Sequence, residues 1–63
     1  MKKGTVKFFN EDRGFGFIKD DESQEDIFVR QTGCIDEIRE NDKVEFNVQQ
    51  GQKGLNAVDV KIA

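Results

Sequence analysis

The sequence predicts an all-β protein whose strands close into one small barrel. Five short segments alternate apolar and polar residues, which is the pattern of strands that bury one face. Clusters of glycine and charged residues with the character of turns separate these segments. Because 63 residues leave no room for a second sheet, we expect one domain over residues 1–63, whose antiparallel strands close on themselves and leave no exposed edge.

The first two strands are expected at residues 3–10 and 15–19. Residue types that favour strands fill the first of them: Thr5, Val6, Phe8 and Phe9. Residues 11–14 end this strand, because Glu-Asp-Arg-Gly has the composition of a turn. In the second strand, the period of two places Phe15 and Phe17 on one face and Gly16 and Ile18 on the other.

The third strand is expected at residues 26–30, after an acidic turn over residues 20–26 that we interpret as solvated. Its two faces differ, since Ile27 and Val29 share one of them and Phe28 and Arg30 share the other. Residues 30–41 alternate poorly and are expected to form a loop, in which Cys34 packs as a small apolar residue.

The fourth strand, at residues 42–49, has the clearest alternation in the chain. Its inward side chains are expected to be Val44, Phe46 and Val48. A turn at residues 51–54 leads to a fifth strand at residues 55–62. The inward face of this last strand carries either Ala57 or the set of Val58, Val60 and Ile62.

The composition excludes several classes of function. The chain has no histidine, tyrosine or tryptophan and a single cysteine, which removes the usual general bases, zinc ligands and nucleophiles. We therefore expect no enzymatic activity, no metal and no cofactor. The acidic run at residues 20–26 resembles a calcium loop only superficially, because Glu25 stands where such a loop needs glycine. Without a long apolar run or a signal-peptide pattern, we expect a cytoplasmic protein.

The charges are unevenly distributed along the chain, whose net charge is −3. Residues 1–19 carry five basic and two acidic residues, a local charge of +3. Residues 20–45 carry three basic and ten acidic residues, a local charge of −7. This polarity is compatible with a confined electropositive face on an acidic molecule.

The phenylalanines indicate what such a face would bind. A barrel of one layer has one interior, and the aliphatic faces of the second and third strands occupy it, which leaves three rings outside: Phe15, Phe17 and Phe28. An apolar patch of this kind beside Lys7, Arg13 and Arg30 suits a flat, negatively charged ligand, such as unpaired nucleobases on their phosphate chain. In the opposite interpretation these rings are the core, but Gly16 could not cover the other face.

Two segments carry a resemblance to a known family. Residues 7–10 read Lys-Phe-Phe-Asn and residues 13–18 read Arg-Gly-Phe-Gly-Phe-Ile, which resembles the first ribonucleoprotein motif of the cold-shock domain. Residues 26–30 resemble its second motif, and residues 51–60 are similar to its last hairpin. The resemblance implies a five-stranded OB-fold barrel that binds single-stranded RNA or DNA by stacking and acts as an RNA chaperone.

The resemblance also implies roles for individual residues. Phe15, Phe17 and Phe28 match the stacking rings of the family, Lys7 and Arg13 match residues that contact the nucleic-acid backbone, and Lys53 matches a basic residue of the last loop. This chain departs from the pattern at three positions: Phe8 replaces the usual tryptophan, Arg30 the usual histidine and Gln31 the usual phenylalanine. The segment after Cys34 is shorter than usual and lacks an aromatic residue.

The first strand poses a problem of register, because Val6 and Phe8 have the same parity. The resemblance requires Val6 inside and Phe8 on the surface. Either a bulge separates them or Phe9 is the outward ring, so both Phe8 and Phe9 are candidate ligand contacts, with partial core burial as the alternative for Phe9.

Two further hypotheses remain open. A barrel with an exposed ring patch and net negative charge also suits a protein-interaction module that binds a peptide or partner. An OB-type factor associated with the ribosome is the other possibility. In each case we expect a monomer without a membrane association.

Overall fold

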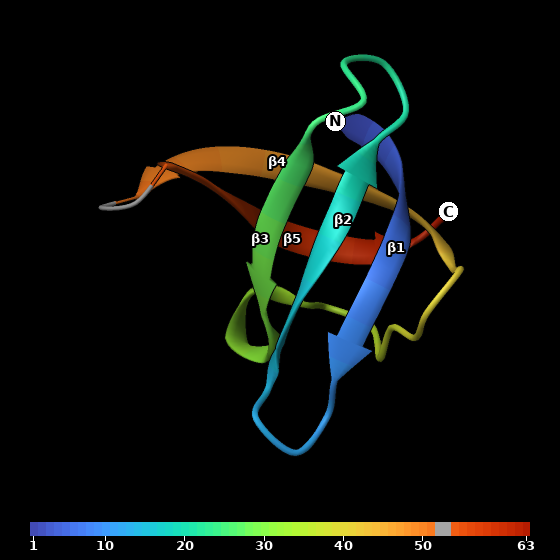
Figure 1. Ribbon diagram of the computed structural model, residues 1–63, viewed down its shortest axis with the longest axis vertical. Helices are drawn as coiled ribbons and strands as arrows, with labels where there is room; N and C mark the ends of the chain where they lie inside the picture. Colours follow the sequence, from blue (N-terminus) through green and yellow to red (C-terminus); the bar gives the residue numbers. More distant parts are fainter. Residues whose placement is uncertain (52–53) are drawn as a thin grey trace.

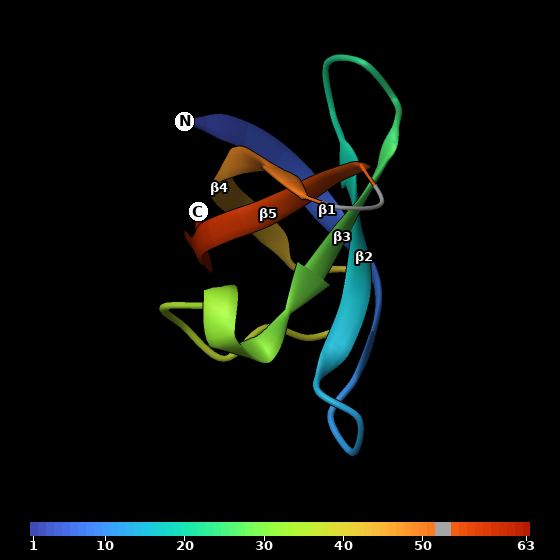
Figure 2. The same cartoon turned by 90° about the vertical axis from the view of Figure 1, so that its left-hand side faces the viewer.

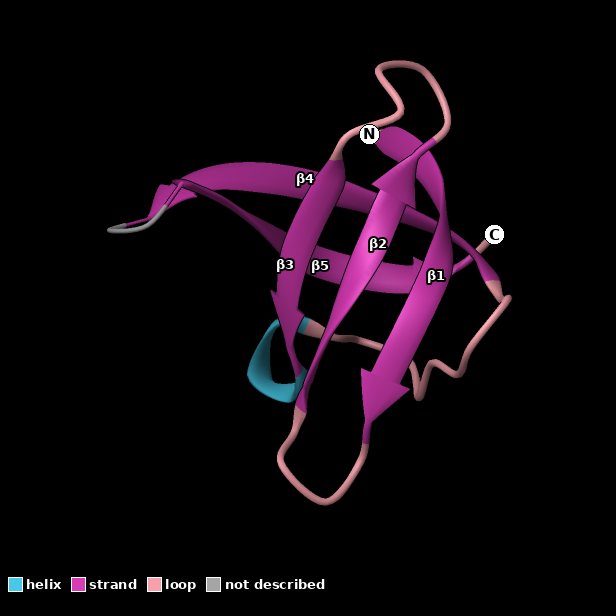
Figure 3. Cartoon of the chain, viewed as in Figure 1, coloured by secondary structure: helices cyan, strands magenta, loops and turns pink. Residues whose placement is uncertain are grey.

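Five strands form where the alternating segments predict them. The computed structural model describes residues 1–51 and 54–63, and its strands differ from the predicted ranges by at most two residues at an end (Figures 1 and 3). The bounds are as follows: β1 Lys2–Asn10, β2 Phe15–Asp20, β3 Asp26–Arg30, β4 Lys43–Gly51 and β5 Gly54–Ile62. The all-β fold class is confirmed.

The strands close into a barrel in the order β1-β2-β3-β5-β4, with β4 pairing back to β1. This confirms the expected five-stranded OB-fold barrel, with one correction. The pairing of β3 with β5 is parallel, whereas the sequence predicted antiparallel strands throughout. The correction has a geometric cause, because five strands cannot alternate in direction all the way around a ring, and one neighbouring pair must be parallel.

The interior of the barrel is aliphatic, with one buried aromatic ring. The predicted inward residues Ile18, Ile27, Val29, Val44 and Phe46 are all buried, and Val48 packs against them at the edge. Burial of this set provides most of the stabilisation, since each fully buried aliphatic side chain contributes about 1.5–3 kcal/mol.

Neither of the two predicted inward faces of β5 describes the whole strand. Ala57 and Val60 are both buried although they differ in parity, while Ile62 is exposed. The register of β4 and β5 shifts between Glu45 and Asn47, and Asp59 has a positive φ of 54° at that place. This bulge reverses the alternation within β5, so Ala57 of the first alternative and Val60 of the second are buried, whereas Val58 and Ile62 are not.

The segment after β3 closes the lower end of the barrel. A short 3₁₀ helix, η1, covers Gln31–Gly33, and Cys34 then forms an isolated parallel bridge with Val60. Cys34 packs against the core as predicted, and burial raises the pKa of its thiol. Ile38 is 1% exposed, so the predicted loop supplies a core residue that the sequence did not indicate.

Asp20 corrects the interpretation of residues 20–26 as a wholly solvated turn. Residues 21–26 are exposed, but Asp20 is 1% exposed. Its carboxylate accepts hydrogen bonds from the backbone N–H groups of Glu22 and Ser23, at 2.8 and 3.4 Å, and pairs with Lys2 at 3.3 Å. The hydrogen bond from Glu22 is the main cause that lowers the pKa of Asp20, against the opposing effect of burial.

Replacement of Asp20 is expected to destabilise the fold in a pH-dependent way. Asp20→Ala leaves the two N–H groups of the turn without their acceptor, which costs about 1–3 kcal/mol at neutral pH. Because the native pKa lies below the unfolded value of about 3.9, this contribution is present above that value and is lost as the pH falls through the native pKa. Urea unfolding of both proteins at neutral and acidic pH measures the difference.

The exposed neighbour Asp21 provides the control for this experiment. Its ion pair with Lys43 spans 3.8 Å between exposed side chains, so Asp21→Ala should change stability by at most about 0.5 kcal/mol. An equal loss of stability in both variants would contradict the assignment of Asp20 as the anchor of the turn.

Candidate nucleic-acid interface

Four phenylalanine rings lie together on the outer face of β1, β2 and β3, and we call them the ring platform: Phe8, Phe15, Phe17 and Phe28. Phe8, Phe17 and Phe28 are directly opposite one another in register, with ring centroids 5.5 and 5.6 Å apart. Phe15 extends the row, since its ring stacks on that of Phe28 at 5.9 Å and 22° between planes. These contacts lie in the range in which aromatic pairs attract each other.

The platform faces outward because the strands alternate. Ile18, Ile27 and Val29 take the inner positions of β2 and β3 and are buried, so Phe17 and Phe28 project from the other face and are half-buried. Figure 2 shows β2 and β3 side by side along one side of the barrel. The interpretation of these rings as core is therefore wrong.

A bulge in β1 places the ring of Phe8 on the outer face of the barrel. The register of β1 with β2 shifts between Val6 and Phe8, which leaves Lys7 as the extra residue. Val6 is completely buried, while Phe8 is 39% exposed. The bulge resolves the parity problem in favour of Phe8 as the outward ring.

Phe9 is placed apart from the platform. It pairs with Gly16 and packs against the core from the inner side of β1. The structure therefore favours partial core burial for Phe9, the alternative that its sequence position left open. Lys53 lies outside the described residues.

The structure describes three of the predicted cationic residues, Lys7, Arg13 and Arg30. Arg30 holds its guanidinium carbon 5.5 Å from the centroid of Phe28, which is the geometry of a cation–π contact. Lys7 forms an ion pair of 3.0 Å with Asp26 at the start of β3. Arg13 is exposed in the turn after β1, where its backbone N–H donates to the side-chain oxygen of Asn10.

Asp26 is a residue near the site that the sequence analysis did not single out. Its carboxylate accepts a hydrogen bond from the ammonium group of Lys7. A phosphate that approaches Lys7 must therefore compete with Asp26 for that cation. The signal in the sequence was weak, because an acidic residue that begins a strand resembles any other residue of an acidic turn.

The arrangement suits stacking rather than catalysis. A row of half-exposed rings presents flat apolar surfaces to the solvent, while Gly16 between Phe15 and Phe17 is buried on the opposite face of β2. In residues 1–51 and 54–63, no group of three or more potential metal ligands occurs. The same residues contain no helix long and apolar enough to cross a membrane. Fold and surface together define a small five-stranded β-barrel with an aromatic outer face.

The comparisons with known proteins identify the family. Residues 2–63 match the family described as "'Cold-shock' DNA-binding domain", and the chain belongs to this family. The "Major cold shock protein" of Micrococcus luteus is 45% identical over 64 residues, which cover 95% of this chain and 96% of that protein. The "Cold shock-like protein CspG" of Escherichia coli K12 is 46% identical over 61 residues, covering 90% of this chain and 87% of that protein.

A solved structure agrees in fold. The structure "drosophila Unr CSD456" matches with a TM-score of 0.83 at 37% identity, over 98% of this chain. This chain spans 26% of that longer chain. The family resemblance inferred from the sequence is confirmed by both kinds of comparison.

Proposed function

We propose that this protein binds single-stranded RNA or DNA by stacking unpaired bases on the ring platform, and that it acts as an RNA chaperone. The observation that carries the proposal is the row of Phe8, Phe17 and Phe28 in register across three strands. Successive bases of a single strand can each cover one ring, whereas the bases of a duplex are already stacked on one another. Membership of a family described as a DNA-binding domain supports the same proposal.

The cationic residues have a secondary role in this proposal. Lys7, Arg13 and Arg30 would meet phosphates, and Lys53 would add a further contact from the last turn. With so few phosphate contacts and a net charge of −3, affinity comes mainly from stacking. A chaperone that must release transcripts benefits from such weak, sequence-tolerant binding. The protein would work as a single-domain monomer in the cytoplasm, without a cofactor and without enzymatic activity.

The decisive test is the loss of a ring without loss of the fold. Phe17→Ala is expected to weaken binding of labelled oligo-dT or oligo-U by about 1–3 kcal/mol, or about 5- to 150-fold, because each stacked base contributes that much. Fluorescence anisotropy measures the affinity, and circular dichroism checks the fold. Phe15→Ala and Phe28→Ala should weaken binding to a similar degree.

Two further variants make this test specific. Ile62→Ala removes an exposed apolar side chain far from the platform and should leave binding unchanged. Arg30→Gln should reduce the slope of log affinity against log salt by about 0.7, the value of one phosphate contact on a single strand. Tight binding of duplex, or an affinity that salt does not alter, would favour a peptide-binding role for the platform and contradict the proposal.

A further inference from the structure

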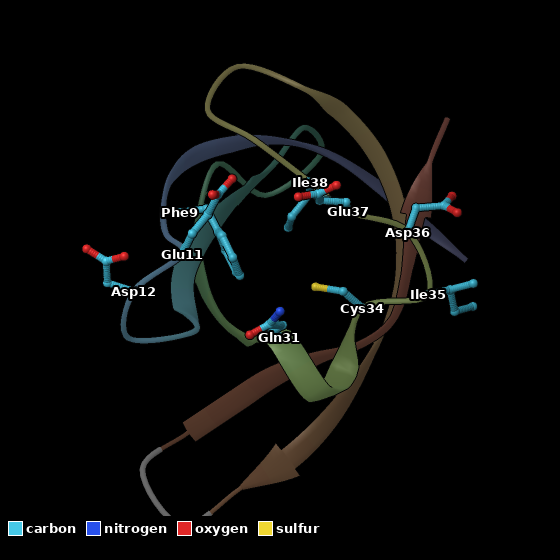
Figure 4. Close-up of a pocket in the computed structure, with 9 residues that line it drawn as sticks. All are labelled: Phe9, Glu11, Asp12, Gln31, Cys34, Ile35, Asp36, Glu37 and Ile38. Carbon is cyan, nitrogen blue, oxygen red and sulfur yellow. The ribbon is translucent and has the colours of Figure 1, made fainter.

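A cavity of about 590 Å³ opens at the lower end of the barrel, between the turn after β1 and the segment after η1 (Figure 4). The ring of Phe9, the thiol of Cys34 and the side chain of Ile38 point into it. Its volume is in the range of sites for small ligands, and these three side chains form the apolar part of an otherwise largely polar lining. The cavity is separate from the ring platform, because Phe8 and Phe9 project from opposite faces of β1.

The rim of this cavity is acidic. Glu11, Asp12, Asp36 and Glu37 line it, and no lysine or arginine does among the described residues. Three acids away from the rim form ion pairs: Asp20 with Lys2, Asp21 with Lys43 and Asp26 with Lys7. No such ion pair involves the four rim carboxylates within residues 1–51 and 54–63. Their negative potential is therefore available to a ligand.

We propose that this cavity binds a basic segment of a partner protein, with one arginine or lysine side chain inserted. The apolar stem of that side chain would lie along Phe9, Cys34 and Ile38, and its cationic head would meet Glu11 and Glu37. The ring of Phe9 adds a surface on which a guanidinium can stack. Nucleic acid is excluded as the occupant, because its phosphates would be repelled by the rim.

The outer carboxylates favour a peptide over a compact cation. Asp12 and Asp36 line the cavity but turn away from its centre (Figure 4), so the negative charge continues beyond the space that one side chain fills. Asp36 is held in place because its carboxylate accepts the backbone N–H of Ile62 at 3.0 Å. A ligand that satisfies all four acids must carry several positive charges along an extended chain.

The test uses a short peptide that alternates arginine and serine, and the same peptide with citrulline in place of arginine. In NMR titrations of the full chain, we expect the arginine peptide to shift the amide signals of Glu11, Cys34 and Glu37 and to leave those of Phe17 and Phe28 in place. The citrulline peptide should not bind, because citrulline has nearly the same shape as arginine but carries no positive charge. Phe17→Ala should bind the peptide normally, which separates this proposal from that for the platform.

A matched pair of variants locates the contact. Glu11→Gln with Glu37→Gln should weaken peptide binding by about tenfold, since each exposed ion pair contributes about a threefold change. Glu22→Gln with Glu25→Gln removes the same charge from the turn at the opposite end of the barrel and should have little effect (Figure 1). Equal weakening in both double variants, binding of the citrulline peptide, equal binding of a free polyamine, or shifts confined to the platform would overturn the proposal.

Discussion

Phe46→Ala is expected to unfold the protein under conditions in which the parent chain is folded. Phe46 is completely buried and has the largest side chain of the core. Truncation of a buried phenylalanine costs about 3–5 kcal/mol, and a core this small supplies little more than that. Circular dichroism and urea unfolding should show a chain without a cooperative transition.

Phe17→Ala is the internal comparison, because it makes the same chemical change on the other face of the barrel. Its ring contacts Phe8 and Phe28 at the surface, and loss of those contacts should cost about 1 kcal/mol. The variant should therefore fold and fail to bind. A folded Phe46→Ala protein, or an unfolded Phe17→Ala protein, would contradict the distinction between core and platform.

Gly16→Ala is expected to cost about 3 kcal/mol or more, although it adds one methyl group. A Cβ at this position would lie 2.8 Å from the Cα of Phe9 and would also meet the carbonyl oxygen of Phe8. Both obstacles are backbone atoms of β1, so no side-chain rotation can relieve the overlap, and β1 and β2 must separate. Urea unfolding measures the loss of stability.

The same variant should also lose affinity for oligonucleotides, because the displaced strands carry Phe8 and Phe17. Lys19→Ala, on the exposed face of β2, should change stability by no more than about 0.5 kcal/mol. A stable Gly16→Ala protein with normal affinity would contradict this prediction. It would show that β1 and β2 can move apart at Gly16 without loss of stability or binding.

Much of the fold could be predicted because burial of one strand face leaves a clear periodic signal. Phe46 and Ile18 were assigned to the core on that basis, and both are fully buried. The features that escaped prediction depend on contacts between distant segments. Ile38 lies in a stretch without periodicity, and the ion pair of Asp20 joins it to Lys2, which is far from it in sequence.

The platform could be predicted for a related reason, since two neighbouring strands place their rings opposite to their aliphatic residues. The position of Phe9 could not be decided, because the alternation of β1 changes at the bulge and the sequence does not mark which residue is the extra one. The ion pair of Lys7 with Asp26 could not be predicted either. It depends on how β1 and β3 are aligned with each other, and β2 lies between them.

The bulge at Lys7 has a consequence for how this strand can change during evolution. Before it, Val6 faces the interior, and after it, Phe9 does, so β1 contains two alternating patterns of opposite phase. Substitutions within either half leave the phases intact. Deletion of Lys7 would remove the extra residue and leave Val6 inward and Phe8 outward in one continuous alternation. Gain or loss of one residue elsewhere in β1 would instead turn part of the strand over, and would move either its core side chains or its ring to the wrong face.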